Sequence, residues 1–192
     1  MCVSLERLFC LTSQQAISVE PRASGKGIFS REDAAGVIAM VQHVHPVGVK
    51  LLEAKIGGNQ HSAAELKQAL SSVFESRNVN QVNAKALATM AVTEVCGIKK
   101  CPHCKGTGFK DYRHKCRNCK GSGVADIRTI KNLTATFNAL SRKTLTEQQF
   151  SQIYYDVYMS VIDELYQHES EAAKYAASVL RLVQAESEVM NG

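Results

Sequence analysis

The sequence of 192 residues has no tryptophan and only 3 prolines. Because proline interrupts helices, this scarcity leaves room for long helical segments. No apolar run reaches the roughly 20 residues that a membrane-spanning helix requires. The first residues include Glu6 and show neither a basic start nor a small-residue cleavage site, so we expect no signal peptide. These absences predict a cytoplasmic protein with no membrane partner.

Long alternation of apolar and polar residues is also missing, which argues against an extended sheet. Apolar residues instead recur at helical spacing, as at Leu66, Leu70 and Phe74. We predict an all-α, mostly helical fold with a small four-cysteine zinc-knuckle insertion, to which any strands are confined. The expected helices cover residues 1–12, 34–43, 49–56, 82–95, 126–141, 146–166 and 169–188, with a further one that starts near Ser62.

Two capping boxes are expected, one formed by Ser62 with Glu65 and one by Thr146 with Gln149. The helical spacing also places Ile130, Leu140, Ile153 and Ala173 on the inner faces of their helices, with Val82 as a further candidate. We divide the chain into a flexible N-terminal segment, a helical region, a zinc knuckle and a second helical region that contains the hairpin. These parts cover residues 1–29, 30–98, 99–124 and 125–192.

Four of the 7 cysteines form two C-x-x-C pairs, each followed by an x-Gly-x-Gly sequence: Cys101, Cys104, Cys116 and Cys119. Two residues between thiolates let one tight turn place both sulfurs on a tetrahedral ion, at ~2.3 Å. The glycines allow the backbone to fold beneath the metal with positive φ. In a reducing cytoplasm this pattern favours metal over disulfides. We therefore predict one structural zinc ion (Zn²⁺) bound by these four cysteines.

Enzyme activity is not expected. The sequence shows no P-loop, no dinucleotide-binding fingerprint and no Ser/His/Asp order typical of hydrolases. Four cysteine ligands would also leave the zinc ion no open position for a catalytic water. A thioredoxin-like redox site at Cys101–Cys104 is disfavoured, because that fold needs a later cis-proline and no proline follows Pro102.

The distribution of charge indicates a polyanionic partner. Residues 99–123 contain eight basic side chains and one acidic side chain, whereas residues 147–192 contain two basic and eight acidic ones. The two helices expected at 126–141 and 146–166 form a possible DNA-binding helix-turn-helix. Glutamines there suit adenine, and arginines and lysines suit phosphates. The expected DNA contacts are Arg128, Lys131, Arg142, Lys143, Gln148, Gln149 and Gln152. An ordinary helical hairpin with a polar face is the alternative.

Several of these features together resemble the late-gene antitermination protein Q family of lambdoid bacteriophages. The resemblance runs from Pro21-Arg22-Ala23-Ser24 through Leu52-Glu53-Ala54 and the helix before Cys101 to both C-x-x-C-x-G-x-G units and the following helical segment. It implies a protein of the bacterial host's cytoplasm that binds double-stranded DNA near a phage late promoter. It also implies loading onto paused bacterial RNA polymerase that still holds its sigma factor, and travel with the polymerase through terminators.

Two other functions stay open at this point. A DNA-binding transcription regulator would keep the DNA contact without travelling on polymerase. The C-x-x-C-x-G-x-G units also resemble the zinc domain of DnaJ-type co-chaperones, which would make the chain a chaperone module. Those co-chaperones carry four such units and a His-Pro-Asp motif, whereas this chain has two units and its only His-Pro precedes Val47.

Overall fold

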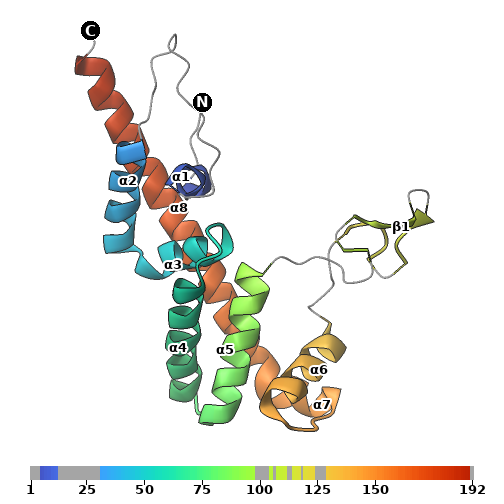
Figure 1. The fold of residues 1–192 in the computed structure, drawn as a ribbon. Coiled ribbons are helices and arrows are strands. Elements are labelled where there is room, and N and C mark those ends of the chain that lie inside the picture. The colour runs from blue at the N-terminus through green and yellow to red at the C-terminus, as the bar shows by residue number, and fades with distance from the viewer. Residues whose placement is uncertain are drawn as a thin grey trace. The chain divides into compact units, whose positions relative to one another are not determined.

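The computed structural model describes residues 5–12, 31–97, 104–105, 107–111, 114–117, 119–123 and 129–190 (Figure 1). Helices dominate, and one two-stranded sheet accompanies them. The elements are α1 (Leu5–Thr12), α2 (Arg31–Val44), α3 (Pro46–Lys55), α4 (Gln60–Ser76), α5 (Gln81–Cys96), β1 (Phe109–Asp111), β2 (His114–Lys115), α6 (Ile130–Ser141), α7 (Glu147–Phe150), the π-helix η1 (Ser151–Tyr155) and α8 (Asp156–Met190). The predicted mostly helical fold is confirmed. Within these ranges, no helix has both the length and the apolar character needed to cross a membrane.

The chain divides into two compact units, one made of Met1–Leu66 with Asp163–Gly192 and the other of Lys67–Ile162. The core of the first unit combines α1, α2 and α3 with the later part of α8. Its most buried side chains are Leu8, Ala34, Val41, Val49, Leu52, Ala172 and Ala176. The amino-terminal helices therefore bury their apolar faces against a segment that lies more than a hundred residues later in the sequence.

A glycine sets the closest approach between α3 and α8. Pro46 occupies the first turn of α3, where its missing N–H costs nothing, and Gly48 follows it. A Cβ atom at Gly48 would lie 2.5 Å from the carbonyl oxygen of His168 and 2.6 Å from the Cβ of Ala172. Helix α2 ends at Val44, close to the predicted end at residue 43, and Pro46 starts α3 three residues before the predicted start at residue 49. Gly48 lets the backbones of α3 and α8 pack together.

Gly48→Ala is expected to destabilise the protein by about 1–3 kcal/mol, because the added methyl group meets a backbone carbonyl and has no room to relax. The matched control is Gly36→Ala in the exposed middle of α2, where a Cβ would meet no atom within 4 Å. That change should stabilise the protein by about 0.5–1 kcal/mol through helix propensity. Urea unfolding measures both, and equal effects of the two substitutions would contradict the close approach.

The second unit is built around α5, which small residues allow to be buried on most of its circumference. Ala84, Ala88 and Ala91 are fully buried, as is Leu87. Two polar side chains of α5 contact the long carboxy-terminal helical segment. The Asn83 Nδ2 atom donates to the Tyr154 hydroxyl, and the Tyr158 hydroxyl donates to the Glu94 Oε2 atom at 2.7 Å.

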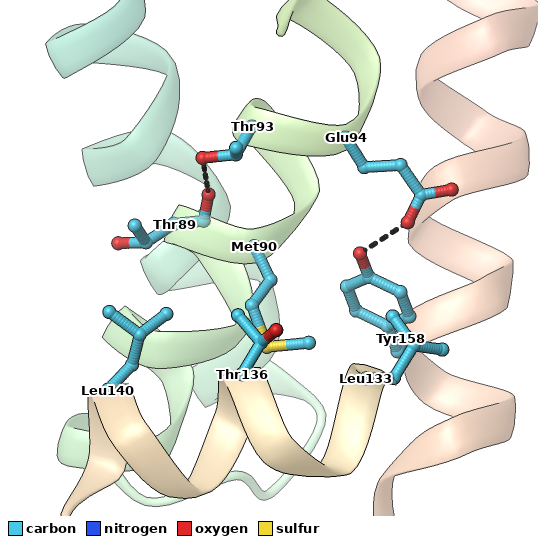
Figure 2. Close-up of a pocket in the computed structure, with 8 residues that line it drawn as sticks. All are labelled: Thr89, Met90, Thr93, Glu94, Leu133, Thr136, Leu140 and Tyr158. Carbon is cyan, nitrogen blue, oxygen red and sulfur yellow. Dashed lines mark hydrogen bonds between the residues drawn. The ribbon is translucent and has the colours of Figure 1, made fainter. Parts of the chain in front are cut away.

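The Glu94–Tyr158 pair is enclosed by protein, since the two residues are 1% and 0% exposed. It borders a largely apolar cavity of about 210 Å³, which Met90, Leu133 and Leu140 also line (Figure 2). A buried carboxylate without a hydrogen-bond donor would be costly, so the Tyr158 hydroxyl stabilises this packing.

The predicted capping box of Ser62 and Glu65 is wrong. Helix α4 begins at Gln60, and the Asn59 Oδ1 atom accepts from the N–H groups of His61 and Ser62, at 3.0 and 3.3 Å. The Ser62 hydroxyl donates instead to the Glu53 Oε2 atom at 2.6 Å. Glu65 pairs with the Lys50 ammonium group at 3.0 Å. Asparagine caps helices as well as serine does, and here it lies three residues earlier.

Five positions expected to face inward are exposed, each for a local reason. Val82 is 60% exposed because it shares the solvent face of α5 with Lys85 and Thr93. Ala173 is also exposed, since the neighbouring Ala172 points into the core. Ile130 and Leu140 are 36% and 45% exposed near the two ends of α6, where Leu133 and Phe137 face inward instead.

Ile153 is 56% exposed because of the π-helix η1. Hydrogen bonds from i to i+5 insert an extra residue into the turn, so the inner face passes from Phe150 to Tyr154 and Tyr158. The two helices expected at 146–166 and 169–188 also prove to be one uninterrupted helical segment from Glu147 to Met190.

Candidate metal centre and helical hairpin

Two short loops of similar sequence carry the cysteines. The described residues after Cys104 and Cys119 share backbone features, with φ angles of 51° and 52° at Lys105 and Lys120. A side chain other than glycine seldom adopts this left-handed conformation. Its occurrence at equivalent positions shows that the two halves of the knuckle are local copies of one turn.

Backbone amides reach back to the sulfurs in both copies. The Gly108 N–H donates to the Cys104 Sγ atom at 3.3 Å, and the Gly123 N–H donates to the Cys119 Sγ atom at 3.3 Å. Both glycines have positive φ angles, of 77° and 73°. Gly108 and Gly123 therefore turn the backbone beneath the sulfur atoms, as the sequence predicts for them.

Hydroxyl groups brace both turns in the same way. The Thr107 Oγ1 atom donates to the Cys104 carbonyl oxygen, and the Ser122 Oγ atom donates to the Cys119 carbonyl oxygen, each at 2.8 Å. The x-Gly-x-Gly sequence thus has a hydroxyl residue at its third position in both copies. This repeated side-chain bond closes each loop onto its own cysteine.

The two halves are joined by close backbone contacts. The Cys116 N–H donates to the Gly108 carbonyl oxygen at 2.8 Å. A Cβ atom at Gly108 would lie 2.4 Å from the carbonyl oxygen of Gly121, so only glycine fits there. Strands β1 and β2 pair antiparallel between the halves, with Phe109 opposite Lys115. Within the described ranges, strands occur only in this segment.

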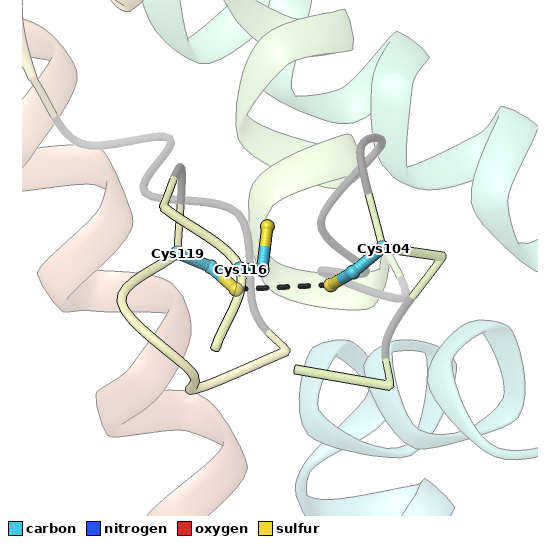
Figure 3. A group of neighbouring side chains, drawn as sticks. All are labelled: Cys104, Cys116 and Cys119. Carbon is cyan, nitrogen blue, oxygen red and sulfur yellow. Dashed lines mark hydrogen bonds between the residues drawn. The ribbon is translucent and has the colours of Figure 1, made fainter. Parts of the chain in front are cut away.

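Three sulfur atoms meet inside this frame (Figure 3). The Sγ atoms of Cys104, Cys116 and Cys119 all lie within 4.8 Å of one another, and those of Cys104 and Cys119 are 3.7 Å apart. A tetrahedral ion with bonds of 2.3 Å would hold its sulfurs ~3.8 Å apart. The three cysteines are buried and form a cluster of their own. They are therefore placed to hold a metal ion, whereas Cys101 lies outside the described residues.

The local electrostatics favour the ligand form of these side chains. Burial raises the pKa of the Cys119 thiol, but the N–H groups of Gly123 and Gly121 and the neighbouring sulfurs outweigh it. The pKa of Cys119 consequently lies below its ordinary value. Since the thiolate is the form that binds metals, the backbone amides prepare this cysteine for coordination.

Helices α6 and α7 form a short hairpin whose turn is held by side chains. The Asn138 amide donates to the Leu145 carbonyl oxygen and accepts from the Leu145 N–H, both at 2.9 Å. Arg142 ends α6 in the left-handed conformation. Phe137 of α6 packs against Phe150 and Tyr154, with ring centroids 5.4 and 4.9 Å apart. The hairpin is therefore fixed by both hydrogen bonds and a ring cluster.

The predicted capping box at the start of α7 is confirmed. The Thr146 hydroxyl accepts from the Gln149 N–H at 3.3 Å, and the Gln149 Oε1 atom accepts from the Thr146 N–H at 3.0 Å. This reciprocal pair satisfies two amide groups that the helix itself leaves unpaired. It also gives the Gln149 side chain a structural role.

One family matches the chain over almost its whole length. The matching family is described as conserved hypothetical protein CHP02642, and it covers residues 2–100 and 98–185. The chain belongs to this family. None of the curated proteins matches this CHP02642 chain at a significant level.

The residues that we expected to contact DNA are exposed wherever the structure of the CHP02642 chain describes them. Five of them are exposed and lie in the turn and at the start of the next helix: Arg142, Lys143, Gln148, Gln149 and Gln152. Lys131 is also exposed, but it lies at the other end of α6, roughly 16 Å from Arg142 along the axis. Arg128 lies outside the described residues.

Two structural roles in this region were not predicted from the sequence. Asn138 was not singled out, although an asparagine near a helix end is a common sign of side-chain bonding to a turn. The lysines that follow Cys104 and Cys119 were predicted only to contribute positive charge. In the structure they also adopt the left-handed conformation that forms each turn. The repeat of Cys-Lys-Gly in both units was the available signal for that shared role.

Cys116→Ser is expected to abolish tight metal binding and to unfold the knuckle, because metal binding and folding are coupled in small sites. Cys101→Ser should do the same if the fourth ligand is the one that the sequence predicts. The matched control is Cys10→Ser in α1, an exposed cysteine remote in sequence. Metal content per chain, measured by inductively coupled plasma mass spectrometry, checks this. Unchanged metal content in Cys116→Ser would contradict the site.

Proposed function

We propose that this CHP02642 protein is a sequence-specific DNA-binding transcription antiterminator. In this proposal it loads on promoter-proximal paused bacterial RNA polymerase and allows read-through of terminators in phage late genes. The observation that carries the DNA-binding part is the braced hairpin of α6 and α7, which presents exposed arginine, lysine and glutamine side chains. The polymerase part rests on the resemblance to the antitermination protein Q family.

One structural zinc ion completes the proposed protein. Cys104, Cys116 and Cys119 would supply three thiolates, and Cys101 a fourth from the same C-x-x-C turn as Cys104. The 3.7 Å separation between the sulfurs of Cys104 and Cys119 supports a tetrahedral ion of this size. Zinc would hold the knuckle in shape and take no part in chemistry, since its four positions are filled. We accordingly propose no enzymatic activity.

The hairpin would act as a helix-turn-helix, with α6 as the supporting helix and the start of the following helix in the major groove. Gln148 and Gln152 are exposed there and have the amide geometry that pairs with adenine. Gln149 would contribute mainly through its cap. Arg142 and Lys143 in the turn, with Lys131 and Arg128, would contact phosphates and fix the register on the duplex.

Bacterial RNA polymerase with its sigma factor would be the protein partner, in the cytoplasm of the host. The surfaces available for it would be the amino-terminal helices and the acidic segment after the hairpin, where seven acidic side chains occur between residues 156 and 192. DNA is negatively charged, so this acidic segment would repel it. DNA would therefore bind at the basic knuckle and the hairpin instead.

Gln148→Ala and Gln152→Ala should each weaken binding to the specific site by about 1–3 kcal/mol if the side chain makes a bidentate base contact. Gln68→Ala, an exposed glutamine of α4, is the matched control and should change nothing. Gel-shift titration against the specific site and against random duplex DNA measures the difference. An equal loss on both DNAs would contradict base reading.

Transcription with purified bacterial polymerase tests the whole proposal. The template carries the cognate late promoter followed by a terminator, and a matched template lacks the promoter-proximal DNA. Read-through that requires both the protein and that DNA is the expected result. DNA binding without read-through would contradict antitermination and favour a plain transcription regulator. Neither binding nor read-through, with zinc bound, would favour the chaperone-like alternative.

A further inference from the structure

The knuckle exposes an aromatic ring, whereas the other phenylalanines that the structure describes are buried. Of the five phenylalanines that the structure describes, Phe9, Phe74, Phe137 and Phe150 are at most 7% exposed, whereas Phe109 is 44% exposed. Phe109 begins β1, and every residue of β1 and β2 is exposed. The ring of Phe109 therefore presents a stacking surface to solvent instead of filling a core.

Positive charge predominates in the segment that carries this ring. The described cations of the knuckle are all exposed: Lys105, Lys110, Lys115, Arg117 and Lys120. Asp111 is the acidic residue among the described positions of this segment. Residues 99–123 hold eight basic side chains, so they stay positive even beside four thiolates and a zinc ion. The field of the knuckle thus attracts a polyanion.

The backbone fixes where several of these cations stand. Lys115 is the cross-strand partner of Phe109, and side chains directly opposite in an antiparallel pair share a face. A Cβ atom at Gly121 would lie 3.2 Å from the Lys115 Cδ atom, so the stem of Lys115 runs along bare backbone. Lys105 and Lys120 follow equivalent cysteines in the same conformation. An exposed ring and lysines at defined backbone positions are thereby combined on one small module.

We propose that the knuckle is a binding surface for single-stranded nucleic acid. Phe109 stacks on one unpaired base, and Lys105, Lys115 and Lys120 hold phosphates of the same strand. A duplex offers its phosphates but keeps its base faces stacked, so an exposed ring selects a single strand. This surface lies in a different segment from the hairpin of α6 and α7. Single-strand binding by the knuckle does not require that the protein be an antiterminator, because the exposed ring and the lysines alone account for it.

Fluorescence anisotropy with the zinc-loaded full chain tests this surface. The probes are labelled oligo-uridine and oligo-thymidine strands of about 12 nucleotides and a duplex of equal length. Phe109→Leu keeps an apolar side chain but removes the ring, and it should weaken single-strand binding about tenfold while leaving duplex binding unchanged. Preference for the uridine strand would identify RNA as the ligand, and equal binding would identify single strands in general.

The lysines are tested by salt dependence. Lys105→Gln combined with Lys120→Gln should flatten the slope of log affinity against log salt by about 1.4, which corresponds to two lost phosphate contacts on a single strand. The matched control is Lys67→Gln with Lys85→Gln, which changes the charge equally on α4 and α5 and should leave the slope as it is. Zinc content is measured for each variant.

Two results would overturn this proposal. One is single-strand affinity of Phe109→Leu equal to that of the original chain, with zinc retained. The other is an equal change of slope in both lysine pairs, which would mean that charge acts without a defined site. Because neither measurement uses transcription, the outcome is separate from that of the read-through experiment.

Discussion

In the proposed protein, the bond between thiolate and metal is the interaction on which the knuckle depends. Its described strand residues are all exposed, and its buried cluster consists of Cys104, Cys116 and Cys119 alone. Such a segment buries too little apolar surface to offset the entropy of ordering its backbone. A structural zinc ion supplies on the order of 10–16 kcal/mol in small sites. With that bond made, the repeated turns at Lys105 and Lys120 and the exposed ring of Phe109 become fixed features.

The helical units rely on a different constraint, which is the burial of apolar faces between segments distant in sequence. The first unit closes α1, α2 and α3 with Ala172, Ala176 and Leu180 of α8. Gly48 makes the approach of α3 to α8 possible. In the second unit, Glu94 and Tyr158 join α5 to α8 by a buried hydrogen bond. Each unit therefore needs residues from the carboxy-terminal half of the chain.

The sequence predicted those features whose cause is local. Capping at Thr146 and Gln149, the turns after the cysteine pairs and the helical periodicity all follow from neighbouring residues. The errors arose where tertiary context decides between nearby candidates. Asn59 rather than Ser62 caps α4, and the π-helix turns Ile153 outward because Tyr154 joins the ring cluster with Phe137. The grouping of three cysteines could be predicted from spacing, whereas the brace at Asn138 needed coordinates.

The proposed function joins these parts. A knuckle with three clustered cysteines and exposed cations is followed in the chain by a braced hairpin with exposed amides. In our proposal, zinc holds the knuckle and both surfaces contact nucleic acid. X-ray absorption at the zinc edge of the purified chain tests the centre that organises the knuckle. A four-cysteine site predicts four sulfur neighbours at ~2.3 Å. A nitrogen neighbour at ~2.0 Å in place of one sulfur, or a chain purified without zinc, would contradict it.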